Sequence, residues 1–213
     1  MMETLIGEII RNGKRKKEYD IFFLDTSSFS KYSCLLLKTL SEEEKRRAST
    51  ISRACLKELF VIRKGILRCL LSVYLRCDPW DVGINRKENG KPYVDAENLF
   101  FNVSHTKNIF AVVVSKEFEV GVDVQYIKNV SDVSALVSDF CSKAEIAAYT
   151  SLGSRDLQQN FFFRVWTAKE AFVKCIGTGL TIDLREVEVL GKRTYRNGRE
   201  ILMDFGSVQV DCV

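Results

Sequence analysis

The sequence has few of the residues and segments that separate domains or cross membranes. It contains two prolines, Pro79 and Pro92, and no Pro-rich or low-complexity stretch that would form a hinge between domains. No uncharged apolar run approaches the length of about 18 residues that a membrane-spanning helix needs. The first residues lack a basic stretch followed by an apolar core, so we expect no signal peptide and no membrane partner.

Histidine and paired cysteines are also scarce. The one histidine is His105, and the seven cysteines include no C-x-x-C pair. A His-rich metal centre and a zinc site of the usual spacing are therefore excluded. Most of the cysteines lie in apolar contexts, where a free thiol acts as a small hydrophobic residue. The pattern predicts a reduced, cytoplasmic protein.

The overall composition is that of a globular protein. The 213 residues, 46% of them hydrophobic and 28% charged, suffice to bury a core without disulfides or metals. The net charge of +4 is unevenly distributed, because Glu58 is the only acid between Lys45 and Arg76. This basic region is either a solvated helix face or a surface that binds phosphates, nucleic acid or an acidic protein.

Local patterns alternate between helical and extended segments. Ser-x-x-Glu capping boxes begin at Ser41 and Ser142. Helices are predicted over 41–76, with a break near 50–52, and from 156 or 158 to 175. Predicted strands and turns are an exposed turn at 11–17, strands at 21–24, 82–86, 99–104, 109–115 and 120–126, and a hairpin of 193–196 with 199–204 around Asn197-Gly198. This order predicts an α+β chain with two roughly similar halves.

Two segments carry groups suited to a metal ion and to phosphates. Asp123 stands between two valines, so strand alternation puts its carboxylate on the face opposite to theirs. Glu170 and Lys174 are four residues apart and lie on one face of the predicted helix, below Trp166. Taken alone, each pattern is typical of a wet strand face or a surface ion pair. Together, two carboxylates and a lysine would suit Mg²⁺ and substrate phosphates.

Two further segments are polar turns. Ser104 and His105 follow an apolar strand, but no nucleophile elbow is present. Neighbouring residues of an extended chain also point in opposite directions, which disfavours a nucleophile–base pair and favours a grip on a phosphate. The turn at 89–92 presents Lys91 and, taken alone, is typical of an ordinary hairpin.

In this order, the four segments resemble the motifs of Sfp-type 4′-phosphopantetheinyl transferases. The matching stretches are Asn89-Gly90-Lys91-Pro92, Phe101-Asn102-Val103-Ser104-His105, Gly121-Val122-Asp123-Val124, and Trp166-Thr167-Ala168-Lys169-Glu170-Ala171-Phe172-Val173-Lys174 with Gly177-Thr178-Gly179-Leu180. The resemblance covers residues 40–190 and implies two similar α+β halves, related by a pseudo-two-fold axis, with the active site between them. The N-terminal half, 1–119, would contact coenzyme A phosphates and the carrier protein, and the C-terminal half, 120–213, would carry the metal and catalytic residues.

The resemblance also implies a reaction. Such enzymes use Mg²⁺ to transfer the 4′-phosphopantetheine arm of coenzyme A to a serine of an apo acyl or peptidyl carrier protein, and release 3′,5′-ADP. By position, Asp123 and Glu170 would bind the metal. Glu170, or a water that it holds, would accept the serine proton, and Lys174 would neutralise or protonate the leaving phosphate. The residues that would hold coenzyme A phosphates are Lys91, Ser104, His105 and Lys169. Members of this type are usually monomers, and nothing in the motifs indicates a nucleic-acid partner.

Two features depart from the family pattern. The position two residues after Asp123 is usually acidic and is Gln125 here, so a carbonyl or a water would complete the metal site. The basic residues that would grip the 3′-phosphate have no fixed register, and the candidates are Arg47, Lys57, Arg63 and Lys64. The alternative function is a catalytically weak homologue that binds coenzyme A or a carrier protein.

Overall fold

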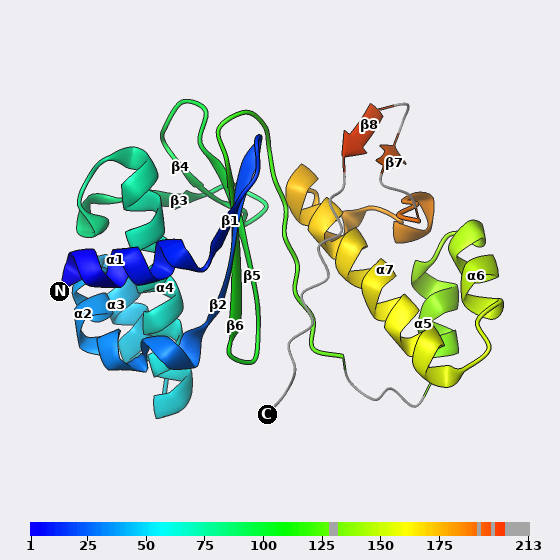
Figure 1. Ribbon diagram of the computed structural model, residues 1–213, viewed down its shortest axis with the longest axis horizontal. Coiled ribbons are helices and arrows are strands. Elements are labelled where there is room, and N and C mark those ends of the chain that lie inside the picture. The colour runs from blue at the N-terminus through cyan, green and yellow to red at the C-terminus, as the bar shows by residue number, and fades with distance from the viewer. Residues whose placement is uncertain (128–131, 191–192, 197–198, 203–213) are drawn as a thin grey trace. The chain divides into compact units, whose positions relative to one another are not determined.

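The computed structural model describes residues 1–127, 132–190, 193–196 and 199–202 (Figure 1). The chain forms two compact units. Unit 1 comprises Met1–Val124 together with Lys174–Gly177, and unit 2 comprises Gln125–Val173 and Thr178–Val213. The α+β class predicted from the sequence is confirmed, whereas the functional division at residues 119 and 120 stays a prediction.

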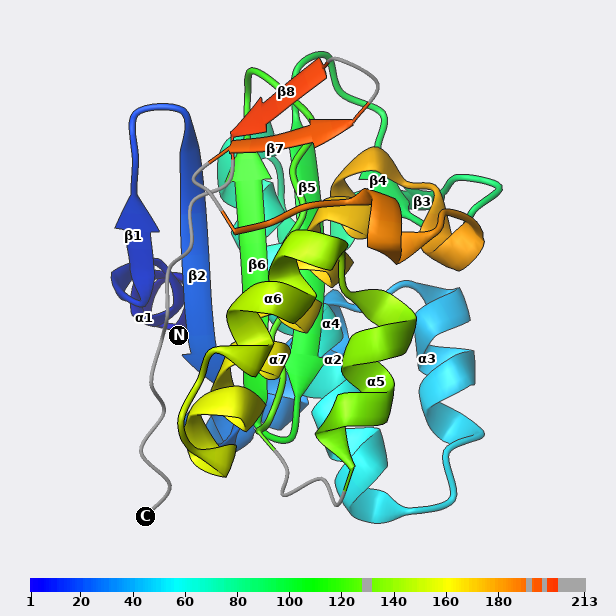
Figure 2. The ribbon, with the colours of Figure 1, turned by 90° about the vertical axis from the view of Figure 1, so that its right-hand side faces the viewer.

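Unit 1 is built on a four-stranded antiparallel sheet in the order β1-β2-β6-β5, which Figure 2 shows side by side. The strands are β1 (Gly13–Arg15), β2 (Tyr19–Asp25), β5 (Phe100–Thr106) and β6 (Ile109–Ser115). The run 11–17, predicted to be an exposed turn, thus includes an edge strand. Side chains of β2 alternate between the two faces, as a half-buried strand requires. Phe22 and Leu24 join the main core, while Ile21 and Phe23 pack against the opposite face.

Helices cover the main-core face of this sheet. They are α1 (Met2–Arg11), α2 (Ser33–Thr39), α3 (Glu42–Ser49) and α4 (Ala54–Leu75), with 3₁₀ turns η1 (Thr26–Tyr32) and η2 (Pro79–Asp81). The helical region predicted over 41–76 is therefore confirmed, including its break. The capping box at Ser41 is also present. A small hairpin of β3 (Ile84–Arg86) and β4 (Pro92–Val94) follows.

The described residues of unit 2 are mainly helical. They form α5 (Val133–Phe140), α6 (Lys143–Thr150) and most of α7 (Arg155–Ile176), then η3 (Gly179–Thr181), η4 (Leu184–Glu186) and a hairpin of β7 (Arg193–Arg196) with β8 (Arg199–Leu202). The second capping box is confirmed at Ser142. Trp166 packs edge-on against Phe140 and stacks on Phe162. The predicted Asn197-Gly198 turn lies outside the described residues. No helix in the described part of the chain is long and apolar enough to span a membrane.

The strand predicted at 120–126 is wrong. Residues 120–127 form no ladder, although Val120 and Val122 are buried as the alternation predicts. The reason lies in two side chains of β5. Asn102 Oδ1 accepts a hydrogen bond from the Val122 N–H at 3.2 Å, and Ser104 Oγ accepts one from the Val124 N–H at 3.3 Å. Side chains thus satisfy backbone groups that a neighbouring strand would otherwise pair.

Candidate functional site

The centre of the candidate site is a contact among Asp123, Ser104 and Lys174, all in unit 1. Asp123 Oδ1 accepts hydrogen bonds from Ser104 Oγ at 2.7 Å and from Lys174 Nζ at 2.5 Å. Lys174 Nζ also donates to Ser104 Oγ at 3.0 Å. The Asp123 side chain is 2% exposed and that of Lys174 is 31% exposed. A buried carboxylate thus has a positive partner, while the ammonium keeps access to solvent.

Different elements bring these three side chains together. Ser104 lies on β5 opposite Ala111, and the same face of the strand carries Asn102, which binds the segment that precedes Asp123. Lys174 lies in the last turn of α7, a position that belongs to unit 1. The contact joins residues that are 51 positions apart in the chain, and three of the sequence-predicted site residues therefore meet at one carboxylate.

His105 lies beside this contact, at the surface of β5. Partial desolvation of its ring lowers the pKa of His105 below the ordinary value, and the positive charges of Arg63 and Lys174 lower it further, against the opposing effect of Asp123. The imidazole is accordingly neutral near pH 7. A neutral ring among positive groups can donate a hydrogen bond to an anion or accept a proton when an anion arrives.

Arg63 adds an unsatisfied donor near His105. Its guanidinium donates to the backbone carbonyl of Lys107, which holds the side chain against the β5–β6 turn. Its Nε atom is buried and has no hydrogen-bond partner among the described residues. A buried donor without an acceptor is costly unless a ligand supplies one. Of the four candidates for the 3′-phosphate, Arg63 is therefore the best supported.

The other three candidates have other surroundings. Lys64 forms an ion pair with Glu44 at 3.5 Å, and burial lowers its pKa. The Arg47 guanidinium lies over the Phe60 ring, 5.7 Å from its centroid. Lys57 is exposed on α4. None of these contacts points to a phosphate in particular.

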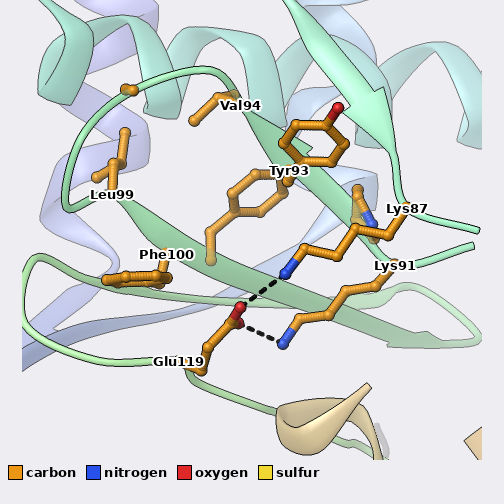
Figure 3. Close-up of a pocket in the computed structure, with 10 residues that line it drawn as sticks. Lys87, Lys91, Tyr93, Val94, Leu99, Phe100 and Glu119 are labelled. Atoms are coloured by element: carbon orange, nitrogen blue, oxygen red, sulfur yellow. Dashed lines mark hydrogen bonds and ion pairs between the residues drawn. The ribbon is translucent and has the colours of Figure 1, made fainter. Parts of the chain in front are cut away.

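Lys91 is buried, in contrast to the exposed lysine that a turn was expected to present. Figure 3 shows its side chain beside that of Lys87, with both ammonium groups directed at Glu119. Lys91 Nζ lies 2.6 Å from Glu119 Oε2 and Lys87 Nζ lies 2.8 Å from Glu119 Oε1. Lys91 also donates to the Cys175 carbonyl at 2.7 Å. These contacts occupy the ammonium, so a phosphate would have to displace them.

Lys169 has a structural environment in unit 2. Its side chain has no exposed surface, and Nζ lies 2.6 Å from Glu145 Oε2. The same ammonium donates to the carbonyls of Leu184 and Val187 at 2.7 Å and 2.6 Å. Three acceptors match the three donors of an ammonium group. The phosphate contact that the motif resemblance implies for Lys169 stays a prediction, whereas the structure shows an internal ion pair.

The remaining predicted ligands, Glu170 and Gln125, belong to unit 2. Glu170 is half-buried and precedes Lys174 by one turn of α7, and Gln125 is exposed. Their roles as metal ligands beside Asp123 stay predictions. Among the residues that the structure describes, no group of three or more His, Cys, Asp or Glu side chains is placed to hold a metal ion.

The donor set nevertheless fits Mg²⁺ bound together with a phosphorylated substrate. The oxygen ligands available in unit 1 are the Asp123 carboxylate and the Ser104 hydroxyl, and oxygen ligands are the kind that Mg²⁺ takes. This ion is usually held by one or two carboxylates, while substrate phosphates and waters complete its octahedron. A buried carboxylate such as Asp123, already paired with a cationic group, meets the protein's share of that requirement.

Sequence reasoning missed Glu119 and could not choose Arg63. Glu119 lies at a chain position with no motif, and its two lysine partners are 28 and 32 residues away. Only the fold reveals these contacts. For Arg63, the sequence indicated only a basic residue on a helix in a basic region, and several neighbouring residues share that description.

A buried carboxylate paired with a lysine, next to a neutral imidazole and an unsatisfied guanidinium, is typical of a site that handles phosphate groups. Comparisons with known proteins agree. The profile of the 4′-phosphopantetheinyl transferase superfamily matches residues 119–211. Over 158 residues the chain is 34% identical to the 4′-phosphopantetheinyl transferase HetI of Nostoc sp. strain PCC 7120, which covers 72% of this chain and 66% of that protein.

Two relatives from Bacillus subtilis match over 137 residues. The 4′-phosphopantetheinyl transferases ffp and Sfp are 30% and 28% identical to the chain, with 63% of this chain and 57% of each relative covered. The chain thus spans about two thirds or less of the length of these relatives. It belongs to the 4′-phosphopantetheinyl transferase superfamily, and the resemblance drawn from its motifs is confirmed.

Proposed function

We propose that this protein transfers the 4′-phosphopantetheine arm of coenzyme A to a serine hydroxyl of an apo acyl or peptidyl carrier protein. The observation that carries the proposal is the Asp123–Ser104–Lys174 contact, with Arg63 and His105 beside it. The family membership and the names of the relatives support the same reaction. We further propose a monomeric, cytoplasmic enzyme with two similar α+β halves and no nucleic-acid partner.

In this reaction the serine oxygen attacks the phosphorus that bears the pantetheine arm. The bond from that phosphorus to the bridging oxygen breaks, and 3′,5′-ADP leaves with the bridging oxygen. The serine proton passes to a base, for which we propose Glu170 or a water that it holds. Bound Mg²⁺ would neutralise charge on the pyrophosphate oxygens. The products are the holo carrier and 3′,5′-ADP.

Residues around Asp123 would bind and orient the metal and the substrate phosphates. Asp123 would hold the metal, with Gln125 as a further ligand directly or through water. Lys174 would then exchange its contact with Asp123 for a phosphate oxygen and stabilise the negative charge that develops on the leaving group. Its 31% exposure leaves room for that exchange. Ser104, His105 and Arg63 would donate hydrogen bonds to phosphate oxygens.

The test is intact-protein mass spectrometry of several apo carrier proteins incubated with this protein, coenzyme A and Mg²⁺. We expect at least one carrier to gain the mass of one phosphopantetheine group, and EDTA to prevent the gain. The matched pair Asp123→Asn and Asp95→Asn separates site from surface, since Asp95 is an exposed carboxylate bonded to Asn85.

The outcomes distinguish the proposal from its alternative. Loss of transfer in Asp123→Asn alone supports the metal site. Transfer at the wild-type rate in Asp123→Asn contradicts it. If no carrier is modified while calorimetry detects coenzyme A binding, the protein is a binding homologue and the proposed activity is wrong.

A further inference from the structure

The turn at residues 89–91 contacts the C-terminal end of helix α7, all within unit 1. Lys91 Nζ donates to the Cys175 carbonyl at 2.7 Å, and Asn89 Nδ2 donates to the Gly177 carbonyl. Asn89 Oδ1 accepts from the Lys91 N–H at 3.0 Å, which holds the turn in shape. One short turn therefore satisfies two carbonyls at the end of a helix of 22 residues.

The Cys175 carbonyl needs a partner for a physical reason, and the Gly177 carbonyl follows directly after the last helical residue, Ile176. The last four carbonyls of an α-helix have no partner within the helix, and the helix dipole makes its C-terminal end negative. A buried ammonium and a side-chain amide are suitable donors there. The backbone is matched to them, since Gly177 has φ +70°, and a Cβ at this position would lie 2.8 Å from Asn89 Nδ2. Glycine thus permits both the left-handed turn and the close approach.

The ammonium of Lys91 also holds the segment that leads to Asp123. It lies 2.6 Å from Glu119 Oε2 and 3.4 Å from the Val120 carbonyl. Its contact on α7, the Cys175 carbonyl, belongs to the residue directly after Lys174. A single buried charge, 7% exposed in its side chain, thus connects the chain segments that carry both partners of the Asp123–Lys174 contact.

We propose that Lys91 and Asn89 are positioning residues that fix the end of α7, so that Lys174 meets Asp123 and Ser104. This inference rests on the proposed function for its catalytic consequence, whereas the contact itself is independent of any substrate. It differs from the role that the motif resemblance implies for Lys91, a direct grip on a coenzyme A phosphate.

Lys87 supplies a matched control. It pairs with the same carboxylate, Glu119, through the other oxygen at 2.8 Å. Its side chain is 45% exposed, and within the described part of the chain its ammonium makes no hydrogen bond to α7. Lys91→Met and Lys87→Met therefore each remove one positive charge from Glu119. Only Lys91→Met also removes the hydrogen bond to helix α7.

The first measurement is hydrogen–deuterium exchange of the ligand-free protein, followed on peptides that cover residues 170–178. A charge-assisted hydrogen bond contributes enough that its loss should speed local exchange about tenfold or more. We expect this acceleration in Lys91→Met and not in Lys87→Met. Asn89→Ala leaves the buried charge of Lys91 in place and should also speed exchange of these peptides. Its control, Glu88→Ala at the exposed neighbouring position, should not.

The second measurement separates positioning from phosphate binding. For Lys91→Met we expect kcat for carrier loading to fall about tenfold, while the calorimetric Kd for coenzyme A changes less than about twofold. A Kd weakened about tenfold or more with wild-type exchange would show a phosphate ligand and overturn the proposal. Equal acceleration of hydrogen exchange in Lys87→Met would also overturn the proposal. So would wild-type exchange in both Lys91→Met and Asn89→Ala. If the wild-type protein transfers nothing, the exchange data still decide the contact, and only the proposed function fails.

Discussion

Helix pair α3–α4 of unit 1 and helix pair α6–α7, most of which belongs to unit 2, contain the same arrangement of charges. Each pair joins a helix of 8 residues to one of 22. In each, a capping-box glutamate at the short helix also accepts from a cation in the long one. Glu44 pairs with Arg68, 24 residues later, at 2.6 Å. Glu145 pairs with Lys169 at the same separation along the chain and the same distance.

The two arrangements differ in their contact with water. In unit 1 the Glu44 side chain is 13% exposed and has Lys64 as a second cation at 3.5 Å. In unit 2 both partners are fully buried, and Glu145 also accepts from the Val189 N–H. A pair that excludes water cannot be replaced by solvent when one partner is lost, so the unit 2 pair should be the more sensitive to substitution.

The positions that follow the cation differ more. After Lys169, helix α7 carries Glu170 and Lys174. At the corresponding positions after Arg68, helix α4 has the buried Cys69 and the apolar Val73, 41% exposed. The same arrangement of charges thus occurs in both helix pairs, whereas only the long helix of the second pair carries a carboxylate and an ammonium, Glu170 and Lys174, beyond its paired cation. The shared arrangement also supports the proposal of two similar halves.

The largest expected effect on the rate of carrier loading comes from alanine at the position directly after the paired cation, which is Glu170 in α7 and Cys69 in α4. Glu170→Ala should lower the rate of carrier loading about 100-fold or more, because general-base catalysis contributes about 10²–10⁴. Cys69→Ala should lower stability through a small cavity and leave the rate per folded molecule unchanged. Loading rates from mass spectrometry and melting curves from circular dichroism measure the two effects. Equal rates in both variants would contradict the assignment of Glu170.

The next largest effect is on the free energy of unfolding, and it compares the paired cations Lys169 and Arg68. Lys169→Met leaves Glu145 buried without its partner, which should lower the free energy of unfolding by about 3–5 kcal/mol. Arg68→Met should cost less, since Glu44 keeps Lys64 and some water. The two tryptophans, Trp80 and Trp166, lie in different units. Urea titrations in a Trp80→Phe background would therefore report unit 2 through Trp166, and a Trp166→Phe background would report unit 1. A larger loss for Arg68→Met would contradict the comparison.

The smallest effect is a shift in the pKa of His105, and it concerns the position five residues after the paired cation, which is Lys174 in α7 and Val73 in α4. Lys174→Val places the residue type of α4 in the last turn of α7 and removes a positive charge near His105, so the pKa of His105 should rise towards about 6.5. Because His105 is the only histidine, its ring protons give a single NMR titration. Lys116→Val, which removes a lysine near the Tyr74 ring, is the control and should leave that pKa unchanged.

The same depressed pKa links stability to pH. The unfolded chain binds a proton at His105 at a higher pH than the folded chain does, so stability should fall as the pH drops from about 6.5 towards the folded pKa. His105→Gln should remove this part of the pH dependence. An NMR pKa at or above the ordinary value in the wild-type protein would contradict the electrostatic picture of the site.

Sequence reasoning succeeded where the physical cause was local. Both capping boxes follow from Ser-x-x-Glu spacing alone, and the break between α3 and α4 follows from a short polar interruption. It failed where distant side chains decide the outcome. Alternation at 120–126 indicated a strand, but Asn102 and Ser104 take the N–H groups that a strand would use. The motif resemblance likewise implied phosphate contacts for Lys91 and Lys169, and it could not reveal the internal acceptors with which the fold surrounds each ammonium group.

Ser104 has a consequence that extends beyond its contact with Asp123. Its hydroxyl accepts from the Val124 backbone, accepts from Lys174 and donates to Asp123. One oxygen therefore sets the register of an extended segment and organises a charged pair. The register of 120–124 is determined by two side chains of β5, independently of the β5–β6 ladder. Architecture and chemistry at this edge of the sheet can consequently be altered together by a single substitution that leaves every main-chain strand pairing of unit 1 intact.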